Sequence, residues 1–172
     1  MADLNITELR RWRKDYQFLE DHALRIGWIS DPIDSPTNRE GKDSKMKSGK
    51  GIVTPKTVGE VARAHELGHG VPQRSMLADT MLFKEREIFR GQAEILGAVI
   101  KGKITSAQGL ALLGEVVLGL IRDRMVAGIK PGLAKSTKRW KARQTQAGMR
   151  KDTALIRWGI MINSIRYKIV RR

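Results

Sequence analysis

The chain contains one short string of residue types that could perform metal chemistry. His65, Glu66 and His69 stand in the order H-E-L-G-H, which fits the H-E-x-x-H pattern of many zinc peptidases. On a helix, two histidines four residues apart share one face and can hold zinc, while the glutamate between them acts as general base. One alternative that the sequence offers is therefore a small zinc metallopeptidase.

A catalytic zinc also needs a third protein ligand. The residue six positions after His69, where an extended motif would place a further histidine, is Ser75. The chain's other histidine is His22, and Glu85 and Glu87 are carboxylates at a plausible distance along the chain. A third ligand is therefore in doubt.

The glycines and proline around the string favour the end of a helix instead. Gly68 lies inside the string and Pro72 follows His69 by three residues, so the helix stops at its second histidine. A catalytic zinc helix needs rigid support beyond that point. We therefore expect no metal and no cofactor, with His65 packed near the helix end and His69 exposed in the turn.

Length and composition fit one folded domain over residues 1–172. Of the residues, 41% are hydrophobic and 30% charged, and there is no cysteine. We expect no disulfide and no thiolate metal site, as in a reducing cytoplasm. The first residues are charged and no apolar run reaches the ~18 residues of a membrane span, so we expect neither a signal peptide nor a membrane partner.

The net charge of +15 is concentrated near the C-terminus. Residues 130–172 hold 13 Lys or Arg and a single acidic residue. Such a segment predicts a polyanionic partner, and a basic nucleic-acid-binding module is a second alternative. Two segments are candidates for the contact: an extended basic loop over 31–53 and a basic connection over 130–151. Their candidate contact residues are Lys42, Lys45, Lys47, Lys50, Lys138, Arg139, Lys141 and Arg143.

Periodicity and capping predict an α+β fold, with a small antiparallel sheet packed against several helices and the long basic loop outside it. We expect helices over 6–21, 57–68, 79–101 and 105–127, and strands over 23–30 and 162–172. Thr57 with Glu60, and Thr105 with Gln108, form capping boxes that start two of the helices.

Burial can also be predicted from helical spacing. In the third helix the predicted buried stripe is Phe89, Ala93, Leu96 and Ile100. In the fourth it is Leu110, Leu113, Val117, Leu120 and Ile121, with close packing expected at Gly109, Gly114 and Gly119.

Three different patches of sequence motif follow one another along the chain. The first is the strand LRIGWIS, which contains Gly27. The second is VGEVARAHELGHGVPQRSML, with a Glu-hydrophobe-Gly turn and then a Pro-x-Arg segment. The third is ALIRWGIMINSIRYKIV. The residues that carry these motifs are Gly27, Glu66, Gly68, Pro72, Arg74, Leu77, Gly159, Asn163, Ser164, Ile165 and Tyr167.

Together these patches resemble the tail-completion proteins of long-tailed bacteriophages, a family also described as neck, head–tail joining or virion morphogenesis proteins. The resemblance runs from about Leu24 to Val170, with departures at Ser75, Met76 and Arg157-Trp158. It implies a structural virion protein with no catalysis, in which H-E-x-x-H is an accident of a helix ending.

The resemblance also implies a place and partners for the protein. Copies would form a ring at the head–tail junction or tail end, in particles assembled in the host bacterial cytoplasm. Neighbours would be portal-adaptor or other neck proteins and tail-terminator or tail-tube proteins. A positive ring could also contact phage DNA through phosphates, without sequence preference.

Overall fold

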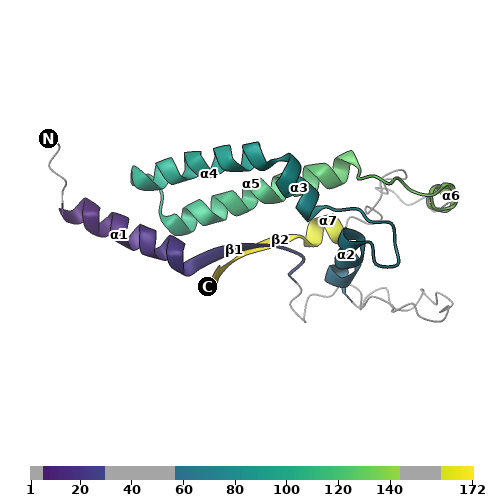
Figure 1. The fold of residues 1–172 in the computed structure, drawn as a ribbon, viewed down its shortest axis with the longest axis horizontal. Coiled ribbons are helices and arrows are strands. Elements are labelled where there is room, and N and C mark those ends of the chain that lie inside the picture. Colours follow the sequence, from purple (N-terminus) through teal and green to yellow (C-terminus); the bar gives the residue numbers. More distant parts are fainter. Residues whose placement is uncertain (1–5, 30–56, 144–159) are drawn as a thin grey trace.

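The computed structural model describes residues 6–29, 57–143 and 160–172, and of residues 140–143 and 160 it describes the backbone alone. In that part the chain forms helices and a two-stranded sheet, which confirms the predicted α+β class (Figure 1). The elements in chain order are α1 (Ile6–Asp21), β1 (His22–Gly27), α2 (Val58–Leu67), α3 (Leu77–Phe83), α4 (Glu85–Ile100), α5 (Ser106–Ala127), α6 (Lys135–Arg143), α7 (Ile160–Ser164) and β2 (Arg166–Arg171).

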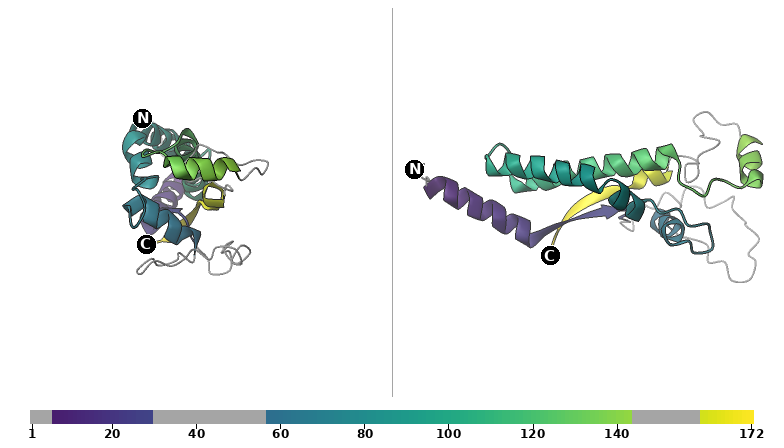
Figure 2. Two further views of the ribbon diagram at one scale, coloured as in Figure 1. Left: turned by 90° about the vertical axis from the view of Figure 1, so that its right-hand side faces the viewer. Right: turned by 45° about the horizontal axis from the view of Figure 1, so that its top comes forward.

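The sheet pairs the strand that follows the first helix with the last strand of the chain. β1 pairs antiparallel with β2, in a register that sets His22 opposite Arg171 and Gly27 opposite Arg166. The long hairpin of α4 and α5 lies along this sheet, and α1 extends away from it at the end where the α4–α5 turn lies (Figures 1 and 2). None of the described helices is long and apolar enough to cross a membrane.

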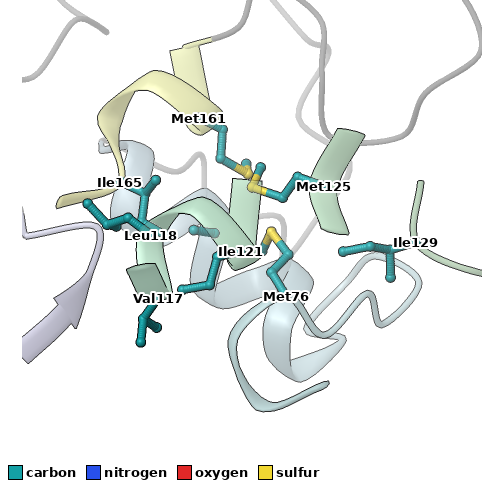
Figure 3. Packing of buried hydrophobic residues seen from close by; sticks show 9 residues of the cluster. Met76, Val117, Leu118, Ile121, Met125, Ile129, Met161 and Ile165 are labelled. Carbon is teal, nitrogen blue, oxygen red and sulfur yellow. The ribbon is translucent and has the colours of Figure 1, made fainter. Parts of the chain in front are cut away.

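The core lies where α5 crosses the sheet and the short helices. Met76, Ile121, Met125 and Ile165 are fully buried there, and Met161 of α7 joins them (Figure 3). Trp28, just after β1, donates its indole N–H to the Met161 carbonyl at 2.7 Å. Residues from both ends of the chain therefore stabilise one cluster.

Two of the three glycines in α5 permit close packing, but only Gly109 packs against another helix, as the sequence predicted, whereas Gly114 packs against a strand. A Cβ at Gly109 would lie 3.0 Å from Ile95 of α4, and a Cβ at Gly114 would lie 2.6 Å from the Tyr167 ring of β2. At Gly119 a Cβ would meet nothing within 4 Å, so the prediction is wrong there.

The predicted helix over 79–101 is two helices. Lys84 ends α3 and begins α4 with a non-helical backbone, so the chain changes direction there. The predicted buried stripe is also wrong: Phe89 is 61% exposed, Leu96 47% and Ile100 51%, and Ala93 is exposed as well. The side of α4 that packs on α5 carries Ile95 and Val99 instead.

Other predictions need smaller corrections. In α5, Val117 and Ile121 are buried as expected, whereas Leu110, Leu113 and Leu120 are half-buried. The connection over 130–151 is not irregular throughout, because it contains α6, and α7 precedes the last strand. The predicted loop over 31–53 lies outside the described residues.

Candidate functional site

The predicted capping box starts α2, the helix that carries the H-E-L-G-H string. The Thr57 hydroxyl accepts a hydrogen bond from the Glu60 N–H at 3.2 Å, and the Glu60 carboxylate accepts one from the Thr57 N–H at 3.1 Å. The helix ends at Gly68, whose φ of 75° is left-handed and favours glycine. His69 therefore lies past the helix end, as the sequence predicted.

The Glu66 carboxylate binds the start of the next helix. It accepts backbone N–H groups from Met76 at 2.6 Å, Leu77 at 3.1 Å and Ala78 at 2.9 Å, and the Ser75 hydroxyl at 2.7 Å. These amides are the ones that a helix leaves without partners at its N-terminus, and a negative charge is stabilising there. Glu66 therefore acts as a remote cap for α3.

These hydrogen bonds set the charge state of Glu66. Partial burial raises the pKa of its carboxyl, but the hydrogen bonds from Ala78, Ser75, Met76 and Leu77 outweigh this and bring the pKa below its ordinary value of 4.5. The ionised form is therefore stabilised by folding. Both carboxylate oxygens are occupied by donors of the chain itself.

Arg74 fastens the same connection to the end of α5. It is 5% exposed, and its guanidinium donates to the Pro131 carbonyl at 2.8 Å and the Gly132 carbonyl at 3.2 Å. Its backbone N–H donates to the His65 carbonyl at 2.7 Å. The motif residues Glu66, Gly68 and Arg74 thus build one structural unit, which we call the clasp, joining α2, α3 and the chain after α5.

His65 is half-buried against the clasp, as expected from the sequence. Burial, followed by the nearby Arg74 guanidinium, lowers the pKa of His65 from 6.5, with a smaller opposing effect from the Pro72 backbone. Because the pKa of His65 is lower in the folded than in the unfolded chain, the unfolded chain binds more protons at pH values between the two pKa values. The resulting stability is present above pH 6.5 and is lost as the pH falls through the folded pKa.

The other candidate zinc ligands are spread among different contacts. Glu87 pairs with Lys84, Glu85 is exposed in the first turn of α4, and His22 stacks on Phe18 with ring centroids 3.9 Å apart. Ser75, which stands where the extended motif has a histidine, donates to Glu66. Within the described residues, no group of three or more His, Cys, Asp or Glu side chains is placed to hold a metal ion.

The remaining motif residues lie mostly in or beside the core. Ile165 is fully buried and Tyr167 covers Gly114, whereas Asn163 is exposed. Gly27 pairs with Arg166 at the end of the sheet. Gly159 lies outside the described residues. Pro72 is exposed, and Leu77, at the first position of α3, packs against the core.

The basic candidates are described only in part. Lys138 and Arg139 are exposed on α6, a nine-residue helix that includes five basic residues and no acidic one. Lys141 and Arg143 lie on the same helix, but their side chains are outside the described part. The four lysines of the 31–53 loop lie outside it as well.

The largest feature that the sequence did not predict is uncovered apolar surface. Among the described residues, fourteen large hydrophobic side chains are exposed, against ten buried hydrophobic residues. They include Phe83 and Phe89 at 66% and 61% exposure and Tyr16 of α1 at 64%. In the sequence, spacings of three and four residues marked the apolar stripe of Phe89, Leu96 and Ile100, but spacing does not say whether a neighbour covers it.

No protein-family model, curated protein or solved structure matches this chain. Its function therefore has to be inferred from the clasp, the basic helix and the uncovered apolar faces.

Proposed function

We propose that the chain is a structural protein of a tailed-bacteriophage virion that forms a ring at the head–tail junction or tail end. In this role it is a tail-completion, neck or head–tail joining protein, and it catalyses no reaction. The observation that carries the proposal is the uncovered apolar surface on α1, α3, α4 and α5. Where exposed apolar side chains adjoin one another, they are typical of surfaces that bind other proteins.

The exposure of α1 also favours a binding partner. Among the described residues, none of the sixteen in α1 is buried. A helix of this length is marginal in water without packing. An assembled neighbour would supply that packing.

The clasp supports the structural reading of the sequence motifs. Among the described residues, those that resemble the tail-completion family make structural contacts. Glu66 caps a helix, Arg74 binds backbone carbonyls and Ile165 fills the core. In this proposal H-E-x-x-H is a helix ending whose glutamate holds the next helix.

The charge supports an acidic neighbour or DNA beside the ring. A subunit of net charge +15 repeated around an axis produces a strongly positive collar. Portal-adaptor, other neck, tail-terminator or tail-tube proteins, or DNA in the lumen, would compensate it. Contacts to DNA would go to phosphates and fall steeply with added salt.

Size-exclusion chromatography with light scattering tests the proposal. We expect one discrete oligomer of more than two copies over a wide range of protein concentration. A protein that stays monomeric throughout contradicts it.

A nucleic-acid-binding module is the second candidate, and the exposed cations of α6 favour it. A monomer that binds duplex DNA with a steep salt dependence would support this candidate over the ring. An oligomer with no measurable DNA binding would exclude it.

A further inference from the structure

One face of the two-stranded sheet carries basic side chains and no acidic one. The two strands contain four Lys or Arg residues and no Asp or Glu. Side chains alternate between the two faces along a strand, and residues opposite each other in an antiparallel pair share a face. Arg25 and its partner Lys168 therefore lie on one face together with Arg166, and all three are exposed. We call this surface the basic sheet face.

The other face of the sheet is covered by the hairpin. Tyr167 lies over Gly114 of α5, and Ile26, which is opposite Tyr167 in the register, packs against the core. α5 in turn lies between the sheet and α4 (Figures 1 and 2). The basic sheet face thus points away from the α4–α5 hairpin.

The pair of Arg25 and Lys168 places two like charges directly opposite each other. Such a pair is destabilising on a sheet. Neither residue belongs to a salt bridge among the described residues. The acidic residue nearest to Arg25 along the chain is Asp21, four residues before it, or ~13 Å along an extended strand. An anion bound on this face would remove the repulsion.

The spacing of these cations suits a phosphate backbone. Arg166 and Lys168 are two residues apart on one strand, which is ~7 Å, and Arg25 lies about 5 Å from Lys168 across the pair. Each strand of B-DNA carries one phosphate per ~3.4 Å of helix axis. Three long side chains at these intervals can therefore each reach a different phosphate.

The composition of the face favours nucleic acid over a protein partner. Its other residues are Ala23, Gly27 and Val170, and none of them is exposed. Interfaces between proteins are more than half apolar, whereas those with nucleic acid are more polar and much more positive. Among the described residues, the exposed large hydrophobic side chains all lie on helices. The basic sheet face therefore lacks the apolar centre that a protein neighbour would need.

We propose that the basic sheet face binds the phosphate backbone of double-stranded DNA, without preference for sequence. This inference rests on the proposed function, in which DNA lies beside the ring, and it names the surface that contacts the DNA. The surface is separate from the basic helix α6, which lies apart from the sheet (Figures 1 and 2).

DNA binding by the variant Arg25→Gln/Lys168→Gln tests the proposal. Both side chains are exposed and their mutual repulsion is removed, so the fold should be retained. With a labelled duplex of arbitrary sequence, we expect at least about a tenfold loss of affinity in low salt. The slope of log K against log salt concentration should become shallower by about 1.8, because each lost phosphate contact changes it by ~0.9. A second duplex of unrelated sequence should give the same result.

The matched control is Arg86→Gln/Arg90→Gln, which removes the same charge from exposed positions of α4. Because α5 separates α4 from the sheet, this control should keep the wild-type salt slope. Equal losses in the two double variants would show that only the net charge matters, and would overturn the proposal.

Lysine acetylation followed by mass spectrometry tests the same surface without substitution. Duplex DNA should slow the acetylation of Lys168 several-fold. Lys101, which is exposed just after α4, should react at the same rate with and without DNA. Equal protection of the two lysines would contradict the proposal.

The outcomes separate this surface from the proposed function. A wild-type ring that does not bind DNA, or binds it equally well after Arg25→Gln/Lys168→Gln, overturns the inference, leaves the ring intact and assigns the face to an acidic protein neighbour. A monomer whose DNA binding depends on Arg25 and Lys168 supports the surface and overturns the ring. A monomer that binds no DNA overturns both.

Discussion

Replacing Glu66 by alanine should destabilise the fold, because it removes the cap that joins α2 to α3. Three backbone N–H groups and the Ser75 hydroxyl lose their shared acceptor. The Ser75 hydroxyl, which is 3.3 Å from the Asp79 N–H, can still cap one amide of α3. The remaining donors must bind water.

The magnitude follows from the kinds of bond lost. A helix N-cap contributes about 0.5–2 kcal/mol, and a hydrogen bond to a charged group about 1.5–3 kcal/mol. Glu66 is only half-buried, so water replaces part of each bond. We expect a loss of about 2–4 kcal/mol in the free energy of unfolding, or a fall in Tm of about 5–15 °C for a chain of this length.

Urea and thermal unfolding at one fixed protein concentration measure this loss, since assembly adds its own stability. Glu87→Ala, which breaks the exposed pair with Lys84, is the matched control and should cost less than about 0.5 kcal/mol. A Glu66→Ala protein as stable as this control would refute the clasp. A zinc peptidase predicts a different pattern, in which Glu66→Gln abolishes a zinc-dependent cleavage and leaves stability unchanged.

Three further predictions concern the core and the clasp. Gly114→Ala should lower the free energy of unfolding by about 1–3 kcal/mol, because its methyl group would overlap the Tyr167 ring. The control Gly97→Ala has open space at its Cβ and should leave the free energy of unfolding equal or raise it by up to ~1 kcal/mol. Equal effects of the two variants in urea unfolding would contradict the packing of Gly114 on Tyr167. Arg74→Met should cost about 2–4 kcal/mol in the same assay, since it removes two part-buried hydrogen bonds from a buried guanidinium, and a neutral result would show that water replaces the guanidinium. Wild-type stability should decrease as the pH falls below 6.5, and less so in His65→Gln; parallel pH profiles would exclude His65 as the source.

Local signals predicted the starts of two helices correctly. Thr57 with Glu60 and Thr105 with Gln108 form the capping boxes that the sequence indicated. A capping box is encoded within four residues, so no distant contact is needed to recognise it.

The clasp could not be predicted in the same way. Glu66 reaches the amides of residues 76–78 across a turn that Gly68 allows, and Arg74 reaches carbonyls 57 and 58 residues further along the chain. Such contacts depend on how α2, α3 and the end of α5 pack together. The string H-E-L-G-H therefore suggested metal chemistry, whereas in the structure its glutamate caps the N-terminus of α3.

The predicted buried stripe of α4 shows a second limit of sequence reasoning. The spacing of Phe89, Leu96 and Ile100 correctly marks one apolar face, but within the described chain that face is exposed. Periodicity identifies an apolar face of a helix, but it does not show which chain covers that face. In the proposed ring, a neighbouring subunit would cover this face.

The most direct test of the ring is electron microscopy of the purified wild-type protein with rotational analysis of the particles. We expect closed rings of one cyclic symmetry. Isolated monomers in the wild-type sample at every protein concentration tested would contradict the proposed assembly.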